Sequence, residues 1–308
     1  MRRLGPIVLF VLLGAIAIAP ARAAVPALRW TMRRLIHYKA HDGLERPAWL
    51  LLPAGYNGRR IPLVISPHGR GVSAWQNTLY WGDLPGEGDF AVICPEGQGR
   101  RLEQYSWGDP GQIADLARMP AIAEAHGVNV ARHRIYAMGG SMGGQETLLL
   151  VARDPRLLAG AVAFDPATDM SMRYRDFASI PGGNVLRVLA RTEVGGTPAT
   201  DPSAYAIRSP DHYVMQLAYS NVPMQLYWSV RDRIIADQRN ETGALADEIR
   251  ELNPRARLWD FEGDWSHTAE MWSDRRLPRA LARFGLIPWS KVPPLRGPEA
   301  TRGPGLLV

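Results

Sequence analysis

Short apolar runs alternate along the chain with longer segments of helical periodicity. Runs without polar alternation predict buried strands at 48–52, 63–66, 90–94, 135–138, 158–164, 224–230 and 258–261. Apolar positions spaced by three and four residues predict helices at 113–126, 145–153, 240–252 and 277–284. Strands that alternate with helices are typical of parallel β-α-β units, and wholly apolar strands indicate a sheet covered on both faces. The expected fold class is therefore α/β, with a doubly wound, mostly parallel sheet.

One segment and one end of the chain depart from this rhythm. Residues 168–212 interrupt the order of strands and helices and contain glycine pairs and several aromatic residues. We expect this insertion to form a small cap over the active site. The segment 291–308 is rich in Pro and Gly, and we expect a disordered tail there. The predicted catalytic domain spans residues 25–290.

The N-terminal residues have the pattern of an export signal. Arg2 and Arg3 precede an apolar run at 7–19, and Ala-Arg-Ala at 21–23 places small residues as signal peptidase prefers. The apolar run is shorter than the roughly 20 residues that a membrane-spanning helix needs. We therefore predict a cleaved signal peptide at 1–24 and a periplasmic or extracellular protein, with an uncleaved anchor as the alternative. No later run is long enough to span a membrane.

Composition and charge exclude several other classes of function. Removal of residues 1–24 takes away three arginines and no acid, which lowers the formal net charge from +6 to +3. The remaining arginines are scattered and form no aromatic–basic stripe, so no nucleic-acid partner is expected. Cys94 is the only cysteine, which rules out an internal disulfide or a C-x-x-C site, and we interpret it as a buried thiol. No metal or cofactor is expected.

The clearest chemical signal is a glycine-rich turn between a predicted strand and a predicted helix. The strand at 135–138 leads into the sequence GGSMGG at 139–144. This is the G-x-S-x-G pattern of a nucleophile elbow, in which glycines two positions before and after the serine avoid collisions in a tight turn. The serine hydroxyl then lies at a helix N-terminus, which favours developing negative charge. We predict Ser141 as a nucleophile; the alternative is a structural turn.

A serine hydroxyl needs a base to remove its proton. Of the seven histidines, only His212 and His267 follow Ser141. In this arrangement the chain order is serine, acid, histidine. His212 precedes the strand expected to supply the acid, whereas His267 follows the last predicted strand. We therefore predict His267 as the base, with a surface loop histidine as the alternative.

The acid that orients the histidine is expected at the carboxyl end of a strand. Asp232 follows the apolar run at 224–230 and precedes His267 by 35 residues. Asp165, just after the preceding strand, is the alternative, and Asp264 is interpreted as a turn residue.

Backbone donors for an oxyanion are expected in two places. The sequence HGRG at 68–71 follows the predicted strand at 63–66, and a small flexible loop there can direct an N–H at a carbonyl oxygen. We predict Arg70 or Gly69 as one donor and Met142, next to the nucleophile, as the other. His68 is expected to shape the loop.

Together these residues resemble the α/β-hydrolase superfamily, and within it the stand-alone catalytic domain of prolyl-oligopeptidase-like (S9-type) serine hydrolases and esterases. The likeness covers about residues 48–285. It is carried by the loop at 68–69, the segment 127–144, the run RSPDHY at 208–213 with Asp232, and the His267 loop. Met142 stands where such peptidases usually have an aromatic residue, and Ser-Met-Gly-Gly is also similar to secreted feruloyl esterases and polyester depolymerases. The resemblance implies an α/β-hydrolase fold with a small cap and a serine hydrolase that works through an acyl-enzyme.

The substrate is expected to be a small-molecule ester or a short peptide, and the sequence leaves both open. Trp107 and Trp265 are predicted to line an acyl pocket, with burial in the core as the alternative for the aromatic residues. One competing hypothesis is a catalytically inactive hydrolase-fold binding protein. Another is a cofactor-free haloperoxidase or lyase on the same fold.

Overall fold

A computed structural model describes residues 30–303, apart from residues 98, 103, 273–275 and 296. The predicted signal peptide at 1–24 falls outside the described residues. Within them, no helix is both long enough and apolar enough to span a membrane.

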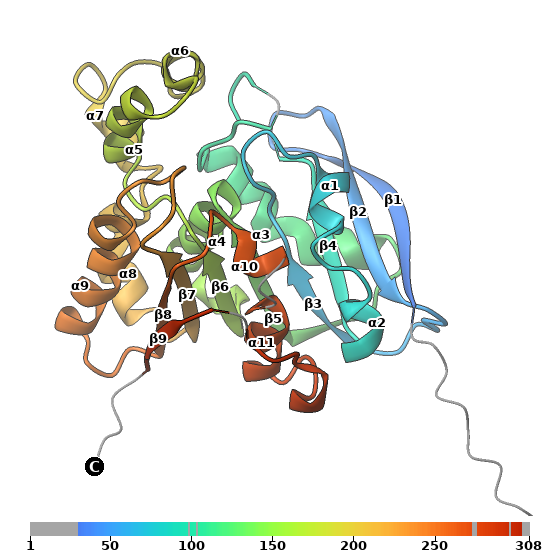
Figure 1. Ribbon diagram of the computed structural model, residues 1–308. Helices are drawn as coiled ribbons and strands as arrows, with labels where there is room; N and C mark the ends of the chain where they lie inside the picture. Colours follow the sequence, from blue (N-terminus) through green and yellow to red (C-terminus); the bar gives the residue numbers. More distant parts are fainter. Residues whose placement is uncertain (1–29, 98, 103, 273–275, 296, 304–308) are drawn as a thin grey trace, which may run out of the picture.

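One sheet runs through the molecule, with the strand order β1-β2-β4-β3-β5-β6-β7-β8-β9 (Figure 1). Its strands are β1 (Thr31–Lys39), β2 (Glu45–Pro53), β3 (Ile61–Ile65), β4 (Ala91–Pro95), β5 (Val130–Gly140), β6 (Gly160–Phe164), β7 (Met224–Ser229), β8 (Leu258–Gly263) and β9 (Glu299–Arg302). All pairings from β4 to β8 are parallel. The strands β1, β2 and β9 are joined antiparallel at the two sides. The predicted doubly wound, mostly parallel sheet is confirmed.

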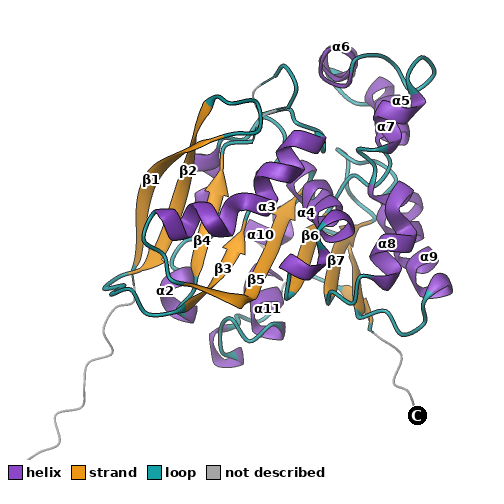
Figure 2. Ribbon diagram, turned by 180° about the vertical axis from the view of Figure 1, so that it is seen from behind, coloured by secondary structure: helices purple, strands orange, loops and turns teal. Residues whose placement is uncertain are grey.

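Helices cover both faces of this sheet (Figure 2). They are α1 (Ala74–Thr78), α2 (Leu84–Gly88), α3 (Pro110–Ala125), α4 (Met142–Arg153), α5 (Met170–Asp176), α6 (Gly183–Val194), α7 (Pro202–Ala206), α8 (Val214–Tyr219), α9 (Ala244–Leu252), α10 (Ala269–Trp272) and α11 (Arg276–Arg283). Shorter turns are η1 (Pro155–Leu157), η2 (Phe177–Ser179), η3 (Pro210–Tyr213), η4 (Arg239–Gly243) and η5 (Trp289–Lys291). One apolar cluster joins α3, α4, α8 and α9 to the sheet, and a second joins α10 and α11 to the opposite face.

The inner strands are apolar throughout because both of their faces are covered. Every residue of β3, β4, β6 and β7 is buried. Such strands can only lie inside a layered α/β fold, since no face is left for water. The carboxyl ends of these parallel strands therefore meet at one edge, where the candidate site is found.

The segment 168–212, predicted as a cap, folds into α5, η2, α6, α7 and η3. In Figure 1, α5, α6 and α7 stand beyond the carboxyl ends of the parallel strands. A third apolar cluster joins this cap to the core, and it includes Trp107, Met142, Met170 and Phe177. The cap is thus packed on the residue that directly follows Ser141.

Two strands differ from the expectations. The predicted disordered tail at 291–308 contains β9, which pairs with β8 from Asp260↔Arg302 to Gly263↔Glu299. Arg302 also forms an ion pair with Asp260, and this contact holds the segment against the sheet. The expectation of disorder was therefore wrong for this strand. The outermost strand β1 was not predicted, because most of its residues are exposed or half-buried and give no apolar run.

Candidate active site

Ser141 lies in the sharp turn between β5 and α4. Its backbone has φ 58° and ψ −125°, a strained conformation for a residue with a side chain. The turn is held because the Ser141 amide donates to the Phe164 carbonyl at 2.8 Å. A Cβ on Gly139 would lie 2.5 Å from Gly143 O, and a Cβ on Gly143 would lie 2.3 Å from Pro67 O. Both flanking glycines of the predicted elbow are therefore required by space.

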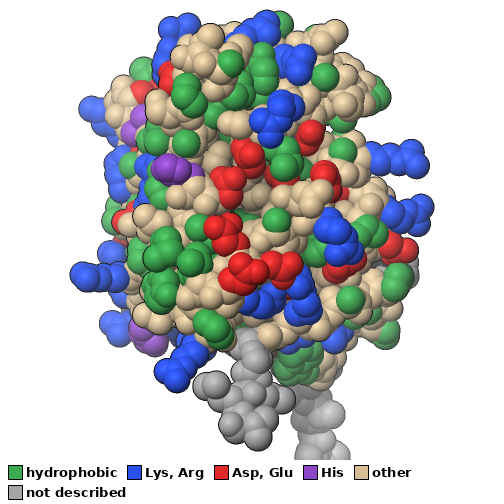
Figure 3. Space-filling model, turned by 90° about the vertical axis from the view of Figure 1, so that its left-hand side faces the viewer, with side chains coloured by type: hydrophobic (Ala, Val, Ile, Leu, Met, Phe, Trp, Pro, Cys, Tyr) green, Lys and Arg blue, Asp and Glu red, His purple; other side chains and the backbone are tan. Residues whose placement is uncertain are grey.

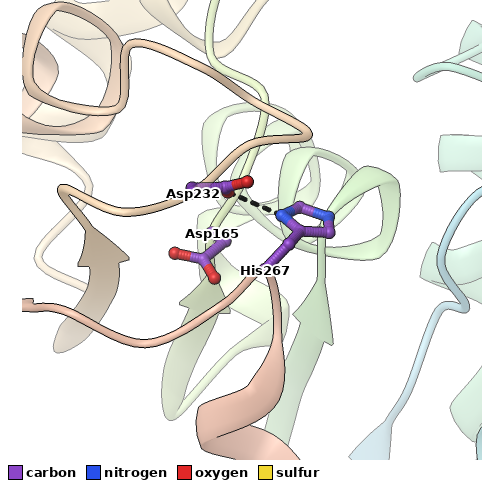
Figure 4. A group of neighbouring side chains, drawn as sticks. All are labelled: Asp165, Asp232 and His267. Atoms are coloured by element: carbon purple, nitrogen blue, oxygen red, sulfur yellow. Dashed lines mark hydrogen bonds and ion pairs between the residues drawn. The ribbon is translucent and has the colours of Figure 1, made fainter. Parts of the chain in front are cut away.

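His267 and Asp232 lie side by side on neighbouring loops (Figure 4). The Asp232 Oδ2–His267 Nδ1 distance is 2.6 Å, and Asp232 Oδ1 accepts from the amides of Ile234 and Ile235 at 2.7 and 3.0 Å. Burial acts to raise the pKa of Asp232, but the hydrogen bond and charge of His267, with these amides, hold the pKa below its ordinary value. Asp232 is thus an anion whose Oδ2 binds the imidazole and whose Oδ1 is held by backbone amides.

Ser141 and His267 face the same cavity of about 240 Å³. Among the hydrogen bonds between described residues, none joins the Ser141 hydroxyl to the His267 ring. Catalytic hydrogen bonds are often loose in a free enzyme and tighten when substrate binds. The structure therefore brings the three predicted residues together, with the Asp232–His267 contact already formed.

Asp165, the alternative acid, serves the loop that carries His267. Its Oδ2 accepts from the Thr268 amide at 2.7 Å and from Trp265 Nε1 at 3.2 Å, and its Oδ1 has no hydrogen-bond partner among the described residues. Burial raises the pKa of Asp165 to about 7. The charge of Asp232 also raises this pKa, whereas the charge of His267 lowers it. Burial and the neighbouring Asp165 also raise the pKa of Glu270 well above its ordinary value. Both shifts favour the protonated forms of these two neighbouring carboxyl groups.

Ligand atoms of Asp165, Asp232 and His267 lie within 4.8 Å of one another. That spacing is compatible with a metal ion, but each group already has another partner. Asp232 and His267 bind each other, and Asp165 accepts from Thr268 and Trp265. The donor set fits an acid that orients a histidine better than it fits an open metal site.

The predicted oxyanion loop lies directly beside the nucleophile. A Cβ on Gly69 would lie 3.9 Å from Ser141 Cβ. The amides of Gly69 and Arg70 have no acceptor within the part of the chain that the structure describes. Met142 begins α4, where the first amides of a helix have no intrahelical acceptor. Backbone donors from both predicted places are thus available at Ser141.

His68 fixes the shape of this loop. Its Nε2 accepts from the Gly97 amide at 2.9 Å, and its Nδ1 lies 2.9 Å from the Gly69 carbonyl oxygen. Burial lowers the pKa of His68, which favours the neutral ring that these two contacts need. This geometry supports the structural role expected for His68.

Trp107 and Trp265, the predicted pocket residues, are both buried. Trp107 is 2% exposed and packs against Phe177 of the cap, and Trp265 is 4% exposed and bound to Asp165. Neither lines the cavity beside Ser141, but Trp265 lines a second cavity of about 630 Å³ that shares Ile234 and His267 with the first. The cavity beside Ser141 is lined by Gly69, Arg70, Val72, Asn77, Tyr80, Gly140, Ser141, Ile234, His267, Thr268 and Met271.

Sequence reasoning missed the apolar lining of this cavity, notably Tyr80, Ile234 and Met271. Tyr80 lies in the loop after α1, Ile234 in the loop that carries Asp232, and Met271 in α10. These three segments are far apart in the chain. The only available signal was the position of Ile234, two residues after the predicted acid.

Comparisons with known proteins identify one family and several structures of similar fold. The model of the family described as "Prolyl oligopeptidase family" matches residues 95–248, half of the chain. The matched region contains Ser141 and Asp232 but ends before His267. Comparison with curated protein sequences finds no significant match.

Several solved structures share the fold. Acylaminoacyl peptidase from Pyrococcus horikoshii is 14% identical with a TM-score of 0.63, over 83% of this chain and 42% of that one. A fungal esterase from Rhizomucor miehei is 13% identical with a TM-score of 0.64, over 82% of this chain and 83% of that one. Dipeptidyl peptidase 4 from Porphyromonas gingivalis is 18% identical with a TM-score of 0.58, over 83% of this chain and 35% of that one. The chain thus spans less than half the length of each of the two peptidases. At such identities the likeness shows the α/β-hydrolase fold.

Proposed function

The chain belongs to the prolyl oligopeptidase family of serine hydrolases, and from this premise we propose that it cleaves a carboxylic ester or a short peptide bond through a Ser141–His267–Asp232 triad. One observation carries the proposal. A serine in a strained elbow and a histidine bound to a buried carboxylate face one cavity. Neither a structural turn nor a surface histidine would need this combination.

The proposed reaction follows from the positions of these groups. His267 Nε2 takes the Ser141 proton as the hydroxyl attacks the substrate carbonyl. Asp232 holds the Nδ1 proton of the ring and stabilises the imidazolium that results. The amides of Met142 and of Gly69 or Arg70 donate to the oxyanion. His267 then protonates the leaving group, and water releases the acyl group by the same steps in reverse.

Acyl transfer to Ser141 is tested with p-nitrophenyl butyrate and a fluorophosphonate probe. The wild type should turn over the ester and be labelled, whereas Ser141→Ala should lose both. Ser203→Ala, in an exposed part of α7, is the matched control and should keep both. Unlabelled wild type would support the inactive binding protein instead, and turnover that depends on peroxide would support a haloperoxidase.

We also propose that the protein is exported. The support is the basic, apolar and Ala-Arg-Ala order of residues 1–24. N-terminal sequencing of the protein from an expressing bacterium should find a chain that begins near residue 25 in the periplasm or the medium. A full-length chain retained in the membrane fraction would indicate an anchor.

A further inference from the structure

Arg173 is a buried cation without a partner. It lies on α5 of the cap and is 3% exposed. Within the described residues its guanidinium makes no hydrogen bond and no ion pair, and its Nη1 is buried without an acceptor. The guanidinium lies over the Phe177 ring, 4.6 Å from the centroid. A buried charge in this state is costly unless something else pairs with it.

The other buried arginines in the described part of the chain do have partners. Arg208 donates to Asp109 Oδ2 at 2.8 Å and to the Ser106 carbonyl at 2.6 Å. Arg276 pairs with Glu299 at 2.9 Å, and Arg46 pairs with Asp42. The fold therefore satisfies buried guanidinium groups where their role is structural. Arg173 is the exception.

Arg173 lies on the side of α5 that belongs to the same packed region as Met142. Residues three and four apart share one face of a helix, and Met170 and Phe177 lie at these positions relative to Arg173. Both belong to the apolar cluster that contains Met142, the residue after Ser141. Arg173 is thus buried on the face of α5 that packs toward Met142, and its charge interacts with those of Arg70 and Asp232.

A second unpaired arginine lies in the cavity itself. Arg70 lines the cavity beside Ser141 and His267. Its side chain, too, has no hydrogen bond or ion pair to any residue that the structure describes. Burial and the charge of Arg70 together lower the pKa of Arg173 to about 10, although Glu241, Asp176 and Asp232 act to raise it. Burial lowers the pKa of Arg70 as well. Both groups remain cations at neutral pH.

The nearby acids do not neutralise this pair. Glu241 Oε2 accepts from the Thr168 amide at 2.9 Å, and burial raises the pKa of Glu241 to about 8, so much of it is uncharged at neutral pH. Asp176 forms no ion pair with Arg173, and burial raises its pKa. Asp232 is bound to His267. Two like charges therefore interact with each other without a paired anion among the described residues, and one of them, Arg70, lines the cavity.

We propose that Arg70 and Arg173 form a carboxylate-binding subsite beside Ser141, so that the substrate is an ester or amide bearing a carboxylate near the scissile carbonyl. This inference rests on the proposed function. The planar fork of a guanidinium matches a carboxylate in two parallel hydrogen bonds. A substrate carboxylate would supply the hydrogen-bond partner that neither arginine has among the described residues. Figure 3 shows a face on which Lys and Arg side chains are scattered and acidic side chains gather in the middle. Selectivity for an anionic substrate would therefore come from the two arginines of the subsite and not from the charge of this face.

Matched pairs of esters test the subsite from both sides of the scissile bond. Mono-p-nitrophenyl adipate is compared with p-nitrophenyl hexanoate for an acyl carboxylate. In the same way, 4-carboxyphenyl butyrate is compared with 4-carbamoylphenyl butyrate for a carboxylate on the leaving group. In one pair, kcat/KM should be higher for the anion by about tenfold or more, as a charge-assisted hydrogen bond allows. Arg173→Met should remove most of that ratio, and Arg173→Lys should keep part of it.

Arg175→Met is the matched control, because this arginine lies on the same helix with its side chain 63% exposed. It removes the same charge and should leave the ratio unchanged. A ratio near one in both pairs, or a ratio that Arg173→Met does not alter, would overturn the subsite while leaving the serine hydrolase standing.

A binding measurement makes the inference independent of turnover. Adipate should raise the melting temperature of the wild type more than adipamide does, and Arg173→Met should abolish the difference. Equal effects of adipate and adipamide, with no anion preference in either ester pair, would refute the subsite. Loss of fluorophosphonate labelling in the wild type would instead refute the proposed function.

Discussion

Replacing each candidate acid by its amide distinguishes Asp232 from Asp165 as the partner of His267. In Asp232→Asn, the amide oxygen can still accept from Ile234 and Ile235, whose donors lie 2.7 and 3.0 Å from Oδ1. The amide nitrogen then faces His267 Nδ1, where Oδ2 lay at 2.6 Å. A donor in this place favours the tautomer with its proton on Nε2, and that tautomer cannot accept the serine proton.

The expected losses differ by orders of magnitude. Because the wrong tautomer disables the base, kcat of Asp232→Asn should fall about 10⁴-fold. In Asp165→Asn, the amide oxygen can accept from Thr268 and Trp265, and the new N–H group takes the side that has no partner in the wild type. The His267 loop is then retained, and kcat should fall by less than about tenfold.

Steady-state hydrolysis of p-nitrophenyl butyrate measures both effects, with circular dichroism melting to show that each variant is folded. Asp264→Asn is the control, because Asp264 is close to His267 in the chain but its side chain is 41% exposed. It should leave kcat within about twofold. A large loss in folded Asp165→Asn with little loss in Asp232→Asn would refute the assignment and make Asp165 the acid.

Three further outcomes follow from buried groups. Burial raises the pKa of Glu146 from 4.5 to about 7, so its contribution to stability is lost as pH rises between these values. Glu146→Gln keeps a partner for Ser106 and should flatten the fall in urea-unfolding free energy from pH 5 to pH 8 by up to about 3 kcal/mol; an unchanged slope would contradict this reasoning. Gly143→Ala should prevent soluble folding, because its Cβ would lie 2.3 Å from Pro67 O; a well-folded, active variant would show that the elbow is not so constrained. Arg173→Met should raise the melting temperature in the absence of ligand, since it removes an unpaired buried charge; a fall of several degrees would indicate a structural partner for Arg173.

The features that could be predicted from the sequence depend on local constraints. The elbow requires glycine at Gly139 and Gly143 whatever the rest of the chain does, so the pattern is visible in the sequence. The inner strands could be predicted because cover on both faces makes them apolar throughout. The candidate acid and base followed from chain order and from the carboxyl ends of these strands.

The features that could not be predicted depend on long-range packing. Trp107 was expected to line a pocket, but whether an indole faces substrate or a cap helix is decided by residues some 70 positions away, such as Phe177. The strand β9 has few apolar residues and is held by backbone pairing and by the Arg302–Asp260 ion pair. Neither produces a periodic pattern. Arg173 looks like any surface arginine until the structure shows that it is buried.

The attachment of the cap bears on how substrate is selected. Glu193 on α6 accepts from the amides of Arg100 and Arg101, and Arg208 at the end of the cap segment donates to Asp109. All these contacts are buried or half-buried, and the apolar cluster that contains Met142 also joins the cap to the core. A cap tied at two places in this way is a fixed wall of the active site, and Arg173 is fixed with it. A preorganised cation loses little freedom when an anion binds. Selectivity for a charged substrate would then come from where the cap holds Arg173 in the free enzyme, without closure of a lid.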